Sequence, residues 1–165
     1  MKFHLIDKIH QITTAPDGPV RIVASKNVSM AEDYLADHFP KFPVLPGVMM
    51  LEALTQAAAW LMYVESNFAK SMAVLKEVRN LRYGNFVAPG NVLTLDVERI
   101  KSTDTGAVFK AVGSIGDQQA LTGRLEMVYF NLADKDPNLA TNDELLITFT
   151  KNRWNVLAPQ GRMAI

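Results

Sequence analysis

The chain has 165 residues, about one domain, and its 48% hydrophobic and 21% charged residues are an ordinary globular balance that argues against wholesale disorder. The 17 basic residues equal the 17 acidic ones, which disfavours a general nucleic-acid binder, because such proteins usually carry a basic excess. The sequence has no cysteine, so disulfides, thiolate metal sites and cysteine nucleophiles are excluded.

The first part of the chain predicts one strand between less regular segments. Residues 3–14 mix apolar and polar side chains and are compatible with a short helix or a turn. Residues 15–19 (Ala-Pro-Asp-Gly-Pro) predict a turn, and the β-branched, roughly alternating residues 20–28 predict a strand. Residues 29–32 (Ser-Met-Ala-Glu) fit a capping box, which predicts a helical turn over residues 33–36.

The first residues lack the uninterrupted apolar run of a signal peptide, so we expect a cytoplasmic protein.

A proline-rich loop precedes the most apolar segment. Pro40, Pro43 and Pro46 restrict the backbone at their own and the preceding positions, so residues 37–47 should form a rigid, extended loop. The segment from Gly47 to about Val64 is apolar at almost every position, which predicts a helix buried on all sides. A few polar residues interrupt this segment, which is too short and too polar to suggest a membrane span.

After residue 66 the pattern changes from helix to strands. Strand-like stretches cover residues 72–75, 80–87, 92–101, 107–115 and 121–129. Turn-forming Gly, Pro, Asp and Asn residues separate the later stretches. One long buried helix followed by consecutive strands predicts an α+β fold, in which an antiparallel sheet packs against the helix.

The C-terminal part of the chain is less regular. Residues 131–142 are polar, and residues 141–144 fit a second capping box ahead of apolar residues at helical spacing. This pattern predicts a terminal helix, although the β-branched residues 147–150 leave a strand as the alternative.

Glu52 is the first candidate for chemistry, because it lies one turn into the apolar helix. Burial favours the protonated form of a carboxyl group, and a protonated carboxyl is what a general acid needs. Gln56 follows four residues later on the same helical face, where its amide can hold the Glu52 carboxyl in one orientation. The alternative is a glutamate that reaches solvent at the helix end or pairs with a cation.

His38 and Gly47 are two further candidates near the start of that helix. His38 precedes the proline-rich loop and is either an acid–base group or an ordinary surface or core histidine. Gly47 lies where the first helical N–H groups have no internal partner, so a carbonyl placed there would have a developing oxyanion stabilised. The alternative is that Gly47 only starts the helix. The chain's histidines lack metal-ligand spacing, and no metal site is predicted.

Taken together, these residues resemble the signature of the 3-hydroxyacyl-(acyl-carrier-protein) dehydratases of type II fatty-acid synthesis. The resemblance is carried by His38-Phe39-Pro40, Pro43, Pro46-Gly47-Val48, Leu51-Glu52-Ala53 and Gln56-Ala57. Weaker similarity on both sides extends it over about residues 3–130.

The resemblance implies a hotdog fold, in which an antiparallel sheet wraps a central helix. This fold would occupy residues 1–130, followed by a C-terminal extension of the same domain over residues 131–165. The resemblance also implies a homodimer, or a trimer of such dimers, in which His38 of one subunit faces Glu52 of the other. An apolar helix would then meet its own sheet on one side and the partner subunit on another.

The resemblance also assigns roles to single residues. His38 would remove the C2 proton of a 3-hydroxyacyl thioester, and Glu52 would protonate the departing hydroxyl group to give the trans-2-enoyl thioester. The Gly47 N–H would polarise the thioester carbonyl, the Val44 carbonyl would orient the His38 ring, and Gln56 would brace Glu52. A glutamate at position 52 points to the branch of the family that dehydrates without isomerising. No cofactor is implied.

The implied partner is an acidic acyl carrier protein, which should meet a basic surface. Lys76, Arg79 and Arg82, opposed only by Glu77, give a local basic excess that suits such a partner, although a solvated strand edge is the alternative. Lys41 stands where the family usually has glycine, and it would strain the loop if that position had a positive φ.

Two other functions are compatible with the same fold. One is a hotdog acyl thioesterase or a CoA-linked hydratase, and the other is a dehydratase-like subunit that binds acyl carriers without turnover.

Overall fold

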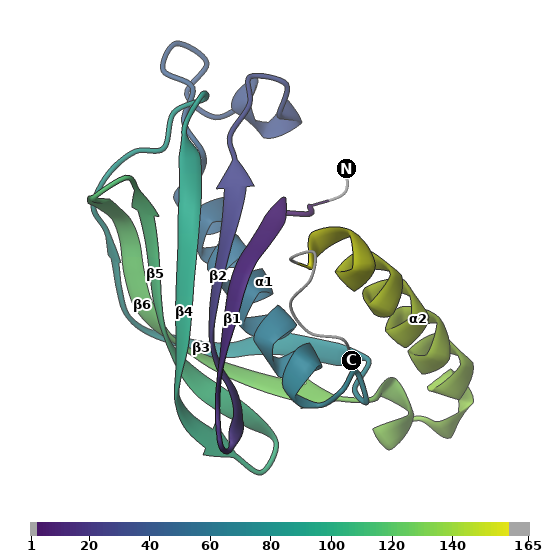
Figure 1. Ribbon diagram of the computed structural model, residues 1–165. Coiled ribbons are helices and arrows are strands. Elements are labelled where there is room, and N and C mark those ends of the chain that lie inside the picture. Colours follow the sequence, from purple (N-terminus) through teal and green to yellow (C-terminus); the bar gives the residue numbers. More distant parts are fainter. Residues whose placement is uncertain (1–2, 159–165) are drawn as a thin grey trace.

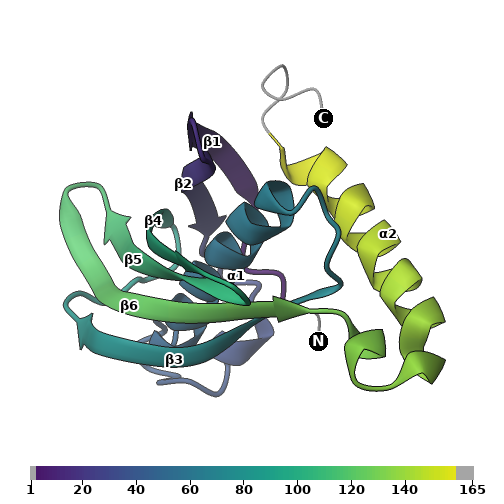
Figure 2. The ribbon, with the colours of Figure 1, turned by 90° about the horizontal axis from the view of Figure 1, so that it is seen from below.

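The computed structural model describes residues 3–158, which form a six-stranded antiparallel sheet curved around one long helix (Figures 1 and 2). The strands are β1 (Lys8–Ala15), β2 (Gly18–Asn27), β3 (Met72–Tyr83), β4 (Val92–Thr103), β5 (Gly106–Ile115) and β6 (Gln118–Phe130). Their order in the sheet is β1-β2-β4-β5-β6-β3, so β1 and β3 form its edges. The helices are α1 (Gly47–Glu65) and α2 (Ala140–Leu157), with short 3-10 turns η1 (Asp33–Leu35), η2 (Leu132–Asp134) and η3 (Pro137–Leu139). The predicted α+β hotdog arrangement is confirmed.

The core lies between α1 and the concave face of the sheet. Leu93, Leu95 and Val97 alternate along β4 and are fully buried, because successive strand residues point to opposite faces of a sheet. Leu54 and Leu61 of α1 are equally buried against this face. The predicted helix is therefore confirmed, and its end differs by only one residue.

The helix α1 is not buried on all sides, which corrects the prediction for its N-terminal half. Val48 is 70% exposed, and Glu52 is also exposed. The C-terminal half is covered by the chain's own α2, which lies on the side of α1 away from the sheet (Figures 1 and 2). Trp154 of α2 packs 6.0 Å from Trp60 of α1 between ring centroids. The helix α1 is long and apolar enough to span a membrane, but more than half of it is buried, as expected of a core helix.

The prediction of a helix or a turn for residues 3–14 is wrong, because β1 occupies residues 8–15. This strand pairs with β2 through a tight turn at Gly18, where φ is 109°. A register shift between Ile9 and Gln11 interrupts the alternation of apolar and polar residues. Residues 8–15 therefore show no clear strand pattern in the sequence, and they are extended because they pair with β2.

Residues 72–83 form one strand, β3, where two shorter strands were predicted. Register shifts follow Leu75 and Arg79, and Asn80 takes a positive φ of 55°. These irregularities break the period-two pattern at the edge of the sheet, which is where bulges are common.

The terminal helix is confirmed as α2, and the strand alternative for residues 147–150 is wrong. The predicted capping box is also wrong, because Leu139 occupies the N-cap position and makes no side-chain cap. The Asp143 carboxylate instead accepts hydrogen bonds from Ser71 Oγ and from the backbone N–H groups of Leu132 and Ala133. These bonds anchor the first turn of α2 to the end of the sheet.

Candidate functional site

His38 lies in the loop between η1 and α1, and local hydrogen bonds hold this loop in shape. The His38 N–H donates to the Tyr34 carbonyl at 3.1 Å, and the Phe42 N–H donates to the Phe39 carbonyl at 2.7 Å. The His38 ring lies 4.4 Å from the Phe39 ring between centroids. The positive φ of this loop, 50°, is at Phe39, whereas Lys41 is not among the residues with positive φ. The strain that Lys41 would impose in place of glycine is therefore absent from the described structure.

A pocket of about 340 Å³ opens beside His38. His38, Val44, Gly47 and Tyr83 line it, together with apolar residues of the loop and of the chain after β3. The aromatic ring of Tyr83 packs against Gly47, where an added Cβ would meet its Cε1 atom at 3.0 Å. Glycine at position 47 therefore keeps the start of α1 open to this pocket.

The first turn of α1 begins at Gly47, which lines the same pocket. The N–H groups of Met49 and Met50 both donate to the Pro46 carbonyl. Those of Gly47 and Val48 have no acceptor within residues 3–158, as expected of the first residues of a helix. A carbonyl oxygen bound there would receive hydrogen bonds at the positive end of the helix dipole.

Glu52 lies one turn further along α1 and is held by Gln56. Gln56 Nε2 donates to Glu52 Oε1 at 2.9 Å and to the Phe3 carbonyl at 2.8 Å. Gln56 Oε1 accepts the Leu5 N–H at 2.9 Å. The Gln56 amide is therefore fixed by the N-terminal segment, and its position fixes one oxygen of Glu52.

Within one chain, the structure does not bring all five predicted site residues together. His38, Val44 and Gly47 line one pocket, whereas Glu52 is exposed on the outer face of α1 and does not line that pocket. The expected burial of Glu52 is wrong for the single chain, because neither the sheet nor α2 covers this part of α1. Residues 3–158 contain no cluster of His, Asp and Glu side chains that is arranged to hold a metal ion.

The predicted basic surface is partly neutralised. Lys76 pairs with Glu126 at 2.6 Å, and Arg79 pairs with Glu77 at 2.7 Å and with Glu126 at 3.8 Å. Glu77 is the acidic residue of this segment itself, and strand pairing adds Glu126 of β6 opposite Glu77. Arg82, by contrast, makes no ion pair with the described residues.

Sequence reasoning missed a set of exposed apolar side chains around the His38 pocket. This apolar collar consists of Phe39, Phe42, Val48, Tyr83 and Phe86. The Phe42 and Phe86 rings pack edge to face with centroids 5.6 Å apart. Contiguous exposed apolar surface of this kind commonly marks a binding interface. The signal in the sequence was the pair Phe39 and Phe42 in a segment predicted as a loop, whereas Phe86 lay in a predicted strand.

Comparison with known proteins gives a consistent result. The family model for the FabA-like domain matches residues 1–124. A 3-hydroxyacyl-(acyl-carrier-protein) dehydratase FabZ of Clostridium kluyveri is 34% identical over 134 residues, which cover 81% of this chain and 88% of that protein. The FabZ of Pediococcus pentosaceus is 36% identical over 115 residues, covering 70% of this chain and 77% of that protein.

Solved structures show the same fold at lower identity. A chain of the dehydratase heterocomplex ApeI:P from Xenorhabdus doucetiae has a TM-score of 0.67 and 17% identity, covering 84% of this chain and 90% of that one. A mutant thioesterase from Pseudomonas aeruginosa has a TM-score of 0.56 and 18% identity, covering 75% of this chain and 82% of that one. At these identities the likeness concerns the fold alone.

Proposed function

The chain belongs to the FabA-like family, and we propose from this membership and its curated relatives that it is a 3-hydroxyacyl-(acyl-carrier-protein) dehydratase of fatty-acid biosynthesis. The observation that carries the proposal is the combination of His38 and the helix N-terminal residue Gly47 in one pocket with an oriented carboxyl group, Glu52, on the same helix. These are the parts that a base-then-acid elimination needs.

The proposed reaction removes one molecule of water. The substrate carbonyl accepts hydrogen bonds from the Gly47 and Val48 N–H groups, which stabilise negative charge as it develops on that oxygen. His38 takes the C2 proton, and the electrons of that C–H bond form the C2–C3 double bond. The C3–O bond breaks as Glu52 donates a proton to the hydroxyl, which leaves as water. We assign Gln56 to hold Glu52 and the Val44 carbonyl to orient the imidazole.

The proposed active form is a homodimer in which each site combines His38 of one copy with Glu52 of the other. Two observations support it. First, His38 and Glu52 lie on different surfaces of a single chain. Second, the apolar collar surrounds the His38 pocket and lies next to the edge strand β3. A twofold contact at this surface would bury the collar of both copies at once. A trimer of such dimers is a larger assembly compatible with the same contact.

The proposed substrate carrier is an acyl carrier protein, as the names of the curated relatives indicate for those enzymes. Arg82 is the basic residue of the predicted surface that no described carboxylate neutralises, so we assign the main carrier contact to it. A cytoplasmic location stays a prediction.

The activity is tested by following enoyl product from a 3-hydroxyacyl-carrier substrate by absorbance. His38→Ala and Glu52→Gln should each lower kcat at least about 100-fold, the range expected for a general acid or base. Full activity in either variant, or release of free thiol without enoyl product, would contradict the proposal.

Shared sites can be tested with mixed dimers. A dimer purified through two different tags, with His38→Ala in one copy and Glu52→Gln in the other, has one site with both groups intact and one with neither. It should recover about half of the wild-type rate, because the dimer has two equivalent sites. If mixed dimers form and stay inactive, His38 and Glu52 do not come from different copies.

A further inference from the structure

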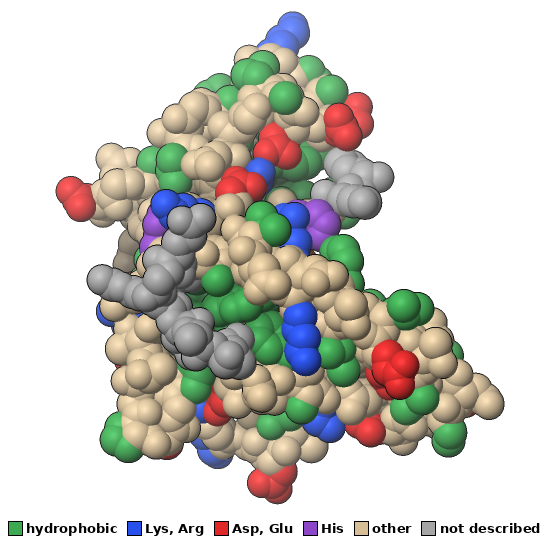
Figure 3. Space-filling model, turned by 45° about the vertical axis from the view of Figure 1, so that its right-hand side comes forward, with side chains coloured by type: hydrophobic (Ala, Val, Ile, Leu, Met, Phe, Trp, Pro, Cys, Tyr) green, Lys and Arg blue, Asp and Glu red, His purple; other side chains and the backbone are tan. Residues whose placement is uncertain are grey.

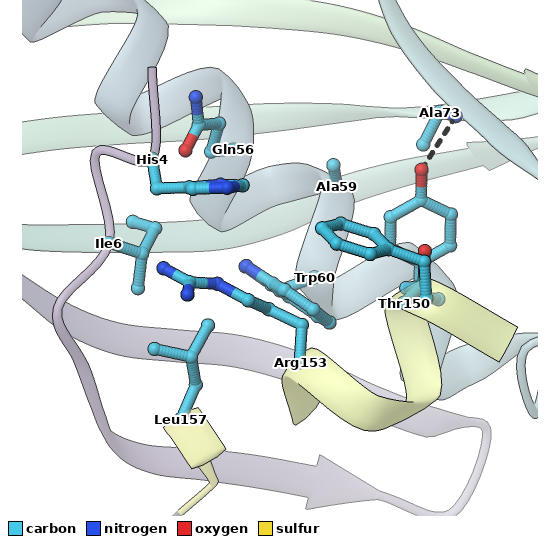
Figure 4. A pocket seen from close by; sticks show the side chains of 11 residues that line it. His4, Ile6, Gln56, Ala59, Trp60, Ala73, Thr150, Arg153 and Leu157 are labelled. Atoms are coloured by element: carbon cyan, nitrogen blue, oxygen red, sulfur yellow. Dashed lines mark hydrogen bonds between the residues drawn. The ribbon is translucent and has the colours of Figure 1, made fainter. Parts of the chain in front are cut away.

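A second pocket, of about 190 Å³, lies between α1 and α2, away from His38 (Figure 4). One of its walls is α2, which lies beyond residues 1–124, the part that the family model matches. Figure 3 brings this side of the molecule forward, where hydrophobic side chains lie next to Lys or Arg side chains. This pocket is therefore a feature of this chain's own C-terminal helix.

Most of the pocket wall is apolar. Trp60 comes from α1, Phe149 and Leu157 come from α2, and Ile6 comes from the N-terminal segment. Such walls bind hydrocarbon or aromatic groups by removing them from water. The volume is below the several hundred Å³ of pockets for drug-sized ligands, which points to a small molecule.

Arg153 supplies a guanidinium group to this pocket. Its half-buried guanidinium extends from α2 across the pocket towards Ile6 and His4 (Figure 4). No carboxylate of residues 3–158 pairs with it. By contrast, Arg99, whose side chain is 5% exposed, is paired with Asp17 and Glu65. A charge that is partly withdrawn from water is stabilised by an opposite charge, and guanidinium groups match the geometry of carboxylates.

We propose that the α1–α2 pocket is a binding site for a small carboxylic acid with an aliphatic or aromatic body. The carboxylate pairs with Arg153, and the body packs against Trp60, Phe149 and Leu157. Gln56 also lines this pocket while it donates to Glu52, so a bound ligand lies one helical turn from the proposed general acid.

The chain carries its own reporter for this site. It has two tryptophans, and both are at the pocket: Trp60 lines it, and Trp154 lies 6.0 Å from Trp60 between ring centroids. Octanoate, kept below its micellar concentration at constant ionic strength, should give a saturable change in tryptophan fluorescence. Octanol, which has the same chain length but no charge, should bind about tenfold more weakly.

Two variants on α2 make the test specific. Arg153→Gln should weaken octanoate binding about tenfold and leave octanol binding unchanged. Lys151→Gln removes an exposed cation from the same helix outside the pocket and should leave both affinities within about twofold. The far-ultraviolet circular dichroism of each variant confirms that it is folded. Equal affinities for octanoate and octanol, or equal effects of the two substitutions, would overturn the proposal.

The same carboxylate chemistry could belong to a free acid or to the far end of an acyl substrate. If octanoate raises KM and leaves kcat unchanged, the carboxylate occupies the path of the acyl chain. If octanoate binds without raising KM, the ligand is a free acid at a separate site. These two results identify the source, whereas the fluorescence titration decides whether the site exists.

Discussion

At the scale of single residues, Gln56 makes more side-chain hydrogen bonds than the other proposed site residues. Its amide ties the N-terminal segment to α1 through the Phe3 carbonyl and the Leu5 N–H, and it holds one oxygen of Glu52. It also lines the α1–α2 pocket. The geometry of the proposed acid therefore depends on a side chain that takes no part in bond making.

Replacing Gln56 by leucine should lower kcat about tenfold with little change in KM, because Glu52 remains but loses its hydrogen bond. The free energy of unfolding should fall by about 1–3 kcal/mol, because the Leu5 N–H and the Phe3 carbonyl lose their partner. Steady-state kinetics and urea unfolding measure the two effects. Gln118→Leu, at the start of β6, is the control and should change neither. A Gln56→Leu enzyme that loses stability but keeps its kcat would remove Gln56 from the proposed machinery.

The proposed site residues come from the sequence, whereas their surroundings could not be predicted from it. The order and spacing of His38, Gly47, Glu52 and Gln56 are local properties, which a motif records. Burial depends on what lies across space from a residue, and the apolar pattern of α1 did not show that its N-terminal half stays uncovered in one chain. The loop that carries His38 has its positive φ at Phe39, a position that the sequence did not single out, and not at Lys41.

At the scale of elements, α2 is held by the hydrogen bonds of Asp143 at its start and by aromatic packing at its end. Trp154 lies 5.9 Å from Phe68 and 6.0 Å from Trp60 between ring centroids. Burial by itself would raise the pKa of the Asp143 carboxyl. The hydrogen bonds from Ser71, Ala133 and Leu132, with the charge of Lys70, outweigh burial and lower this pKa below 3.8.

This lowered pKa makes the docking of α2 dependent on pH. A carboxyl whose pKa is lower in the folded state stabilises that state above its unfolded pKa, and this contribution is lost as the pH falls through the folded value. Asp143→Asn should therefore lower the urea midpoint at pH 7 and speed hydrogen exchange of the α2 amides. Below about pH 3.8 the difference from wild type should shrink, because the wild-type carboxyl becomes protonated as well.

Asp136→Asn, at an exposed cap beside α2, is the matched control and should leave hydrogen exchange in α2 unchanged. A difference between Asp143→Asn and wild type that is the same at pH 3 and pH 7 would argue against this account.

The helices and the central strands could be predicted from the sequence, whereas the edge strands could not. The strands β4, β5 and β6 alternate buried and more exposed residues over most of their length, because one of their faces lies on the core. The β4–β5 and β5–β6 pairings contain one register shift each, against two each in the β1–β2 and β3–β6 pairings. The edge strands β1 and β3 contain register shifts, which move apolar residues out of the period-two pattern. The capping prediction for α2 failed because the helix begins at Ala140, which places Thr141 inside its first turn instead of at the N-cap.

At the scale of the whole molecule, the zero net charge conceals an uneven distribution of charge. Lys76 and Arg79 are paired with Glu77 and Glu126, so the basic surface proposed for an acidic carrier is narrower than the sequence predicted. Charge reversal at Arg82 should therefore raise the KM for a carrier-bound substrate several-fold and flatten its dependence on salt, with kcat preserved.

Lys101→Glu is the matched reversal on the exposed end of β4, and it should leave KM near the wild-type value. A short pantetheine thioester, which lacks the carrier protein, should be turned over equally by the Arg82→Glu variant and by wild type. An unchanged KM for the carrier-bound substrate would remove Arg82 from the proposed carrier surface.

The apolar collar is the surface that we propose for contact with a second copy of the chain. Phe86 is 68% exposed in the single chain, so replacing it by aspartate would not harm an isolated monomer. In the proposed dimer the same change buries a charge next to apolar side chains, once in each copy because of the twofold symmetry. Each buried phenylalanine contributes about 1.5–3 kcal/mol, so Phe86→Asp should weaken the dimer about 100-fold or more. Sedimentation equilibrium should show a halved mass, and activity should be lost on dilution.

Leu145→Asp makes the same kind of change on the outer face of α2, where the side chain is 65% exposed, and it should keep both mass and activity. A Phe86→Asp protein that keeps the wild-type mass would place the partner subunit elsewhere, and the proposed pairing of His38 with Glu52 across this surface would then fail.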